Sequence, residues 1–285
     1  MAATEEFPKQ SKNCSLNSLY NKLNEDNQVW YYICMPSPNI LKEYKKHAYY
    51  HIYNRGINRM GIFKDSRDYQ VFADYLRLSL TPTKRLVKEL EQLLTLDKNN
   101  FQTKQLSNAI QKGAKYQVFK NIDLLAYCLM PNHFHLVVYQ RMKNGIEVLM
   151  RRVATGYAQY FNKRYHRQGT LFESRYKASH LRYDPELQAL FTARYVERNS
   201  LDLVDERRAS NLDQYPYSSL KYYKGGETQK PVWFNTKRLL NIFKKIKSKP
   251  NSSIEDEIAE MEDYHEFVVG DSAISLEEVR LHNIW

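Results

Sequence analysis

The chain has 285 residues, of which 42% are hydrophobic and 26% are charged, so it can bury a core and is not disordered throughout. Its longest apolar run, Leu124 to Met130, is too short to cross a membrane, and its N-terminus lacks the pattern of a secretion signal. We therefore expect a cytoplasmic protein with no membrane partner. A net charge of +11 suits a polyanionic partner such as nucleic acid.

The first predicted elements are a strand and two helices. Residues 1–46 are polar and irregular, and we treat them as an N-terminal extension. A strand that stops at Gly56 is predicted by AYYHIYNRG, which is rich in Tyr and Ile. Apolar residues at helical spacing predict a helix after a cap at Asp65 or Ser66. Residues 81–118 hold a second helical stretch and a polar linker, which indicates an insertion before the next strand.

The middle of the chain predicts further strands and two long helices. Two adjacent strands, or one strand broken at Pro131, are predicted by IDLLAYCLMPNHFHLVVYQ. Amphipathic spacing predicts a helix in GIEVLMRRVATGYAQYFNKRY, and a strand or loop follows in GTLFESRYKASHLR. Asp184 followed by Pro185 marks the start of another helix. This order predicts an α+β fold, an antiparallel sheet of four or five strands with helices on one face.

Charge is unevenly distributed along the chain. Residues 141–182 hold ten basic residues and two acidic ones. Residues 255–285 hold ten acidic residues against Arg280 alone. The predicted basic surface therefore lies in the middle of the chain, and the C-terminal end is an acidic tail.

Four residues suggest a chemical site. The two-residue period of a strand places His133 and His135 on one face, which suits two ligands of one metal, although a solvent-facing histidine pair would look the same. Tyr195 and Asn199 are four residues apart on a predicted helix, so they share a face. That pairing is compatible with a nucleophile beside a metal ligand. It is equally compatible with a half-buried tyrosine and a helix-end asparagine.

Several motifs occur in a family's order over about residues 47–245: MPNHFHLVV, GYAQYFNKRYHRQGTLFESRYK, RYVERNSLDLV, YPYSSLKYY and PVWFNTKRLLNIF. With these motifs the chain resembles the REP-associated tyrosine transposases, a branch of the single-tyrosine HUH transposases. The resemblance implies an HUH nuclease fold with a ferredoxin-like or RRM-like core. It also implies that His133, His135 and Asn199 bind Mg²⁺ or Mn²⁺. Tyr195 would then attack DNA and form a covalent 5′-phosphotyrosine.

The resemblance further implies that the partner is single-stranded or hairpin DNA. Basic side chains are the candidates for contacts to phosphates, and one interleaved aromatic side chain is the candidate for stacking on an unpaired base. The predicted DNA-binding residues are Arg55, Lys163, Arg164, Arg167, Arg175, Tyr176 and Lys177.

The domain division follows from the same reading. We expect a catalytic domain over residues 47–205 and a C-terminal helical extension with the acidic tail over 206–285, in a monomer or a homodimer. Ser200 follows Asn199, and the turn there is two residues shorter than in the family. A hairpin-DNA-binding protein that has lost cleavage therefore stays open as an alternative. Another is an unrelated metal-dependent hydrolase that uses the histidine pair and a water nucleophile.

Overall fold

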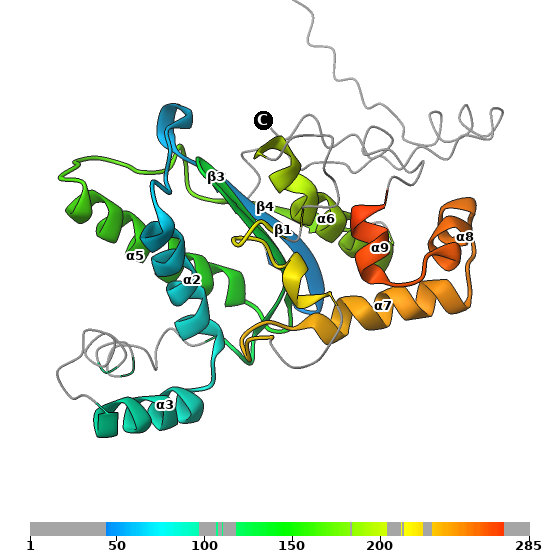
Figure 1. Ribbon diagram of the computed structural model, residues 1–285, viewed down its shortest axis with the longest axis horizontal. Coiled ribbons are helices and arrows are strands. Elements are labelled where there is room, and N and C mark those ends of the chain that lie inside the picture. The colour runs from blue at the N-terminus through cyan, green and yellow to red at the C-terminus, as the bar shows by residue number, and fades with distance from the viewer. Residues whose placement is uncertain are drawn as a thin grey trace, which may run out of the picture. The chain divides into compact units, whose positions relative to one another are not determined.

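Figure 1 shows the computed structural model of the chain. The structure describes residues 44–96, 107, 110, 118–182, 184–203, 212, 214–224 and 230–270. These residues fall within one compact unit. Most of the predicted N-terminal extension, most of the polar linker in the predicted insertion, and residues 271–285 of the acidic tail lie outside the described residues.

A four-stranded antiparallel sheet forms the centre of the fold, with the strands in the order β2-β3-β1-β4. The strands are β1 (Ala48–Arg55), β2 (Ile122–Met130), β3 (His133–Gln140) and β4 (Lys177–Leu181). Strands β2 and β3 are separated only by Pro131 and Asn132. The predicted α+β class is confirmed, and of the two alternatives expected around Pro131 the structure has two adjacent strands.

Helices account for most of the remaining described chain, and two of them begin at predicted caps. The helices are α2 (Ser66–Leu80), α3 (Thr83–Leu96), α5 (Gly145–Arg164), α6 (Pro185–Arg198), α7 (Thr236–Ser248), α8 (Ser253–Glu260) and α9 (Tyr264–Val269). Three 3-10 turns accompany them, η1 (Ile57–Arg59), η3 (Asn199–Leu203) and η5 (Leu220–Tyr222). The Asp65 carboxylate caps α2 by accepting from the backbone N–H of Asp68. Asp184 caps α6 in the same way through Leu187, and Pro185 occupies the first turn.

Helices cover both faces of the sheet (Figure 1). Phe134 of β3 packs against Phe72 of α2, with 5.0 Å between ring centroids. The next residue, His135, contacts Tyr195 of α6. Because neighbouring residues in a strand point to opposite faces, α2 and α6 lie on opposite sides of the sheet. The prediction of helices on one face is therefore wrong. The reason is that β2 is buried along its whole length, so apolar side chains on both of its faces need cover.

The turn between β2 and β3 is held by the segment that follows β1. The carbonyl of Pro131 accepts from the backbone N–H groups of Ile62 and Phe63, at 2.7 and 3.0 Å. The carbonyl of Asn132 accepts from the N–H of Gly56 at 2.8 Å. Only glycine fits at Gly56, since a Cβ there would lie 2.2 Å from the carbonyl oxygen of Met60. These contacts fix the point at which β3 begins.

The C-terminal segment packs on α6. Arg198 donates to the carbonyl of Val268 at 2.7 Å, and the Tyr264 hydroxyl donates to Glu197 at 2.8 Å. The predicted helix in the sequence TKRLLNIFKKI is present as α7, whereas α8 and α9 within the acidic stretch had not been predicted. The domain division stays a prediction. Within the described residues, no helix combines the length and apolar character that crossing a membrane requires.

Candidate functional site

The predicted histidine pair lies on a central strand. His133 and His135 belong to β3, between β1 and β2. In the register of β1 with β3, Tyr53 is opposite His135 and Arg55 is opposite His133. Opposed residues of paired strands point to the same face, so these four side chains share the sheet face that α6 covers.

His135 is completely buried, and two rings of the neighbouring strand β1 lie against it. Its Nδ1 lies 2.8 Å from Nε2 of His51, so the two imidazoles meet edge to edge, with 17° between their planes and 5.0 Å between centroids. The ring of Tyr53 lies 5.8 Å from that of His135, with 22° between their planes, and 5.0 Å from that of His51. Burial lowers the pKa of His135 well below its usual range, and burial lowers the pKa of His51 to about 3. Both imidazoles are therefore neutral at neutral pH.

His133 lies at the start of β3 and is only partly exposed. Its Nδ1 is 2.6 Å from the side-chain oxygen of Asn132. Burial lowers the pKa of His133 to about 4, a hydrogen bond with the Asn199 side chain opposes that shift, and the charge of Arg55 adds to it. His133 is thus neutral at neutral pH as well, which is the form of histidine that binds metals.

Tyr195 and Asn199 come from the C-terminal end of α6. The ring of Tyr195 stands edge-on to His135 at 5.7 Å and to His51 at 6.1 Å, measured between centroids. The Asn199 amide donates from Nδ2 to the carbonyl of Tyr195 at 2.9 Å, and the same side chain interacts with His133. The structure therefore brings the four residues singled out by the sequence together on one sheet face.

The donor set suits a divalent metal. His133 and His135 offer neutral imidazoles, and Asn199 offers an amide oxygen, since its Nδ2 donates to the helix backbone. The carbonyl end of α6 also favours positive charge at this position. Among the residues that the structure describes there is no group of three or more His, Cys, Asp or Glu side chains that could hold a metal.

Two of the predicted DNA-binding residues lie on the face of the site. Arg55 forms an ion pair with Glu173, with 2.8 Å between Nε and Oε1. Lys177 is exposed on the edge strand β4, and its Nζ lies 5.6 Å above the ring of Tyr53. Lys177 therefore places a positive charge beside the aromatic ring that packs on His135.

Two predicted arginines are engaged by protein groups. Arg164 contacts Asp65 at 2.5 Å and the fully buried Asp68 at 2.7 Å. Arg167 donates to the side chain of Asn162 and to the carbonyl of Thr170. Their neighbour Lys163 is exposed on α5. Of these three basic residues, the lysine is therefore exposed to solvent, whereas the two arginines brace the end of α5.

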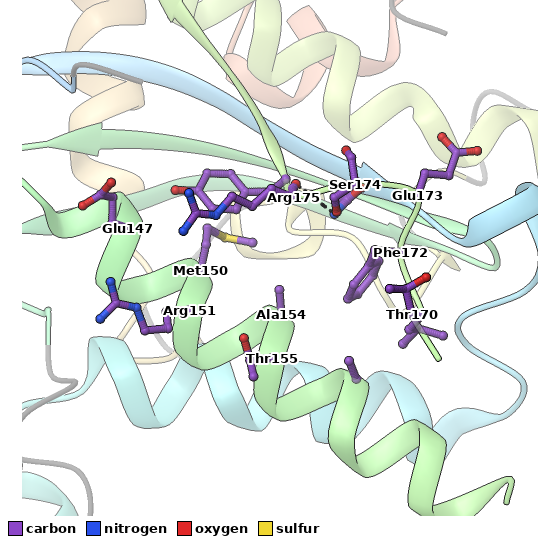
Figure 2. Close-up of a pocket in the computed structure, with 14 residues that line it drawn as sticks. Glu147, Met150, Arg151, Ala154, Thr155, Thr170, Phe172, Glu173, Ser174 and Arg175 are labelled. Atoms are coloured by element: carbon purple, nitrogen blue, oxygen red, sulfur yellow. Dashed lines mark hydrogen bonds between the residues drawn. The ribbon is translucent and has the colours of Figure 1, made fainter. Parts of the chain in front are cut away.

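The last two predicted DNA-binding residues line a pocket of about 500 Å³ on the opposite sheet face (Figure 2). Met150 and Ala154 of α5 form one wall, and the segment that carries Phe172 forms the other. Arg175 is exposed at this pocket. Tyr176 is 9% exposed and its hydroxyl accepts a hydrogen bond from Tyr44, so it does not present a ring for stacking on a base. The pocket lining contains both arginines and glutamates. Because these charges offset one another, the pocket does not favour binding of a phosphate.

Comparison with known proteins bears on these four site residues. Residues 94–199 match the family model described as "Transposase IS200 like". This matched range contains His133, His135, Tyr195 and Asn199. The predicted resemblance to the transposases is confirmed. The matched range begins within α3, so β1 and α2 lie outside it.

A solved structure described as "Structure of the REP associates tyrosine transposase bound to a REP hairpin" is also similar. The similarity covers 70% of this chain and 98% of that chain, with 8% sequence identity and a TM-score of 0.38. No curated protein matches the chain.

The predicted site residues do not include the two β1 residues that pack on His135. His51 and Tyr53 are two residues apart in AYYHIYNRG, so the strand period places them on one face. The sequence therefore indicates that His51 and Tyr53 share a face. It does not indicate that β1 pairs with β3, which is what brings these side chains against the histidine pair.

Proposed function

We propose that this protein cleaves and rejoins single-stranded DNA through Tyr195, in a metal-dependent reaction on hairpin-bearing DNA. The observation that supports this most directly is the position of Tyr195, edge-on to His135, within the range that matches the transposase family model. A phenol next to a pair of neutral imidazoles and an amide is a suitable arrangement for a tyrosine nucleophile beside a metal.

In this proposal His133, His135 and Asn199 hold Mg²⁺ or Mn²⁺. The bound ion would polarise a non-bridging oxygen of the scissile phosphate and stabilise the charge that develops on it. Imidazole ligands favour Mn²⁺ over Mg²⁺ in affinity. Burial keeps both imidazoles neutral and able to ligate, and the backbone of α6 fixes Asn199 one turn beyond Tyr195.

Tyr195 supplies the attacking oxygen. Its phenolic oxygen would lose its proton and form a bond to the phosphorus while the bond between phosphorus and the 3′ oxygen breaks. The leaving 3′ oxygen takes up a proton, which leaves a 5′-phosphotyrosine and a free 3′-hydroxyl. One phosphate ester replaces another, so the 3′-hydroxyl of another strand can attack the phosphotyrosine, re-form the DNA ester and release the phenol. No nucleotide cofactor is needed for rejoining.

Positive charge on the site face would hold the DNA backbone. Lys177 is the exposed candidate beside the site, and Lys163 and Arg175 are the exposed candidates elsewhere. Phosphate contacts of this kind give affinity that falls as the salt concentration rises.

The test is incubation of the full chain with hairpin-bearing single-stranded oligonucleotides and Mn²⁺, followed by a denaturing gel. The proposal expects a covalent protein–DNA adduct that a chelator abolishes and that His133→Ala prevents. Tyr139→Phe, which removes a hydroxyl from the far end of β3, serves as the matched control and should form the adduct normally. Tight binding of hairpins without any adduct would contradict the proposal and favour a binding protein that does not cleave.

A further inference from the structure

A buried histidine that no motif indicated contacts both halves of the candidate site. His51 lies in the middle of β1 and is 2% exposed. Its Nε2 is 2.8 Å from Nδ1 of His135, and its ring stands edge-on to Tyr195 at 6.1 Å. His51 thus lies beside a candidate metal ligand and beside the candidate nucleophile.

The short distance between the two ring nitrogens restricts where the protons can be. Two imidazole nitrogens at 2.8 Å share one hydrogen, because one must donate and the other must accept. If Nδ1 of His135 donates, Nε2 of His135 keeps its lone pair for a metal. If Nε2 of His51 donates, the proton of neutral His135 sits on Nε2 and prevents that atom from ligating.

His133 shows the same arrangement with a different partner. Its Nδ1 lies 2.6 Å from the side-chain oxygen of Asn132, and the amide nitrogen of Asn132 donates to the carbonyl of Arg59 at 3.3 Å. An amide oxygen can only accept, so Nδ1 of His133 is the donor. Nε2 is then the ligating atom of His133, and the same proton position on His135 would make Nε2 the ligating atom of both histidines.

We propose that His51 is a positioning residue that accepts a hydrogen bond from Nδ1 of His135 and so fixes the tautomer and ring orientation in which Nε2 of His135 faces the metal. This inference rests on the proposed function, since it concerns the metal that the function requires. Metal-binding histidines commonly donate their second ring N–H to such a partner, and loss of the partner typically weakens metal binding 10- to 100-fold.

The packing around His135 supports a role in orientation. The rings of His51 and Tyr53 both contact the imidazole from β1, with planes within 22° of its own, and they also contact each other at 5.0 Å between centroids. These ring contacts alone would leave the proton on either nitrogen. The hydrogen bond to His51 is the contact among these that selects one of the two tautomers.

The test compares two substitutions at one position by their affinity for Mn²⁺, measured on the full chain without DNA by electron paramagnetic resonance of the free ion. His51→Leu fills the buried space with an apolar side chain but removes the acceptor, and it should weaken Mn²⁺ binding about 10- to 100-fold. His51→Gln places an amide oxygen near the former Nε2 and should stay within a few-fold of wild type. His180→Leu, on the opposite sheet face, is the matched control and should bind as wild type does.

Melting temperatures would show whether each variant is folded. A folded His51→Leu protein that binds Mn²⁺ as tightly as wild type, while the wild type forms the DNA adduct, would overturn this inference and leave the proposed function intact. A wild type that binds no Mn²⁺ would overturn both the inference and the metal role in the proposed function.

A second measurement needs no variant. Long-range ¹⁵N–¹H correlation spectra of histidine-labelled wild-type protein report the tautomer of each imidazole. We expect a proton on Nδ1 of His135 and none on Nε2 of His51. The opposite pair of tautomers would overturn the inference even if His51→Leu failed to fold.

Discussion

The phenol ring of Tyr195 stands edge-on to the imidazole of His135, at 87° and with 5.7 Å between the ring centroids. One ring comes from the last turn of α6 and the other from the central strand β3. His135 is held by His51 and Tyr53, so the protein itself fixes the histidine that faces Tyr195. A site group positioned in advance in this way loses little further freedom when a substrate binds.

The stability of the helix that carries Tyr195 should depend on pH through Glu197. This fully buried carboxyl accepts from Ser219 at 2.7 Å and from Tyr264 at 2.8 Å. Burial raises the pKa of Glu197 from 4.5 to about 8, although these two hydrogen bonds lower it in part. Unfolding therefore releases a proton between these pH values. The contribution of Glu197 to the free energy of unfolding should fall as pH rises through this window, by up to about 1.4 kcal/mol per pH unit.

Glu197→Gln removes the titrating group and should flatten that dependence. Urea unfolding of wild type and variant between pH 6.5 and 8 isolates the effect in the difference between the two slopes, because the buried histidines are the same in both proteins and contribute equally. Identical slopes for the two proteins would show that Glu197 is not protonated in the folded state.

Alanine at Gly56 should destabilise the protein and disturb the start of β3. A Cβ at this position meets the backbone oxygen of Met60 at 2.2 Å, and that oxygen cannot move as a flexible side chain would. We expect a loss of roughly 1–3 kcal/mol in the free energy of unfolding. Gly61→Ala is the matched control, since the nearest atom to its Cβ is the Pro131 oxygen at 3.7 Å. Equal stabilities of the two variants would contradict the packing described for this turn.

Lys177 should contribute to DNA affinity. It is exposed on β4 with its ammonium above Tyr53, which packs on His135. Lys177→Ala should weaken binding of single-stranded DNA and lower the slope of log affinity against log salt by about one, as expected for one lost phosphate contact. Lys88→Ala, on α3 away from β4 (Figure 1), is the control and should leave that slope unchanged. A Lys177→Ala variant with the wild-type slope would remove this residue from the interface.

Arg164 and Lys163 are adjacent basic residues with different environments. Arg164 bridges Asp65 and Asp68, and hydrogen bonding to Asp65 raises the pKa of its guanidinium above the usual value. Arg164→Ala leaves the buried Asp68 without its arginine and should lower the melting temperature. Lys163→Ala should not, since Lys163 is exposed. Thermal melts of the two variants that coincide would contradict a bracing role for Arg164.

Much of the fold could be predicted because local signals agree with the final structure. The Asp65 and Asp184 caps, the first-turn Pro185 and the break at Pro131 all mark real boundaries. The placement of helices on both faces could not be predicted from these signals. It depends on which strands are interior to the sheet, and that is decided by long-range pairing of β1 with β3 and β4.

The site was partly predictable for the same reason. His133 with His135, and Tyr195 with Asn199, are close in sequence, and each pair shares a face by the period of its own element. That the two pairs lie together in the fold could be predicted only from the motifs of a known family. Tyr176 shows the limit of composition, because an aromatic residue within a basic stretch is buried against Tyr44.

The most direct test of the central claim is to identify the residue that carries DNA. The adduct formed with Mn²⁺ and a hairpin oligonucleotide would be digested with nuclease and protease, and the modified peptide sequenced by mass spectrometry. The account predicts a nucleotide on Tyr195 and no adduct from Tyr195→Phe. A nucleotide on another tyrosine, or strand cleavage that persists in Tyr195→Phe, would contradict it.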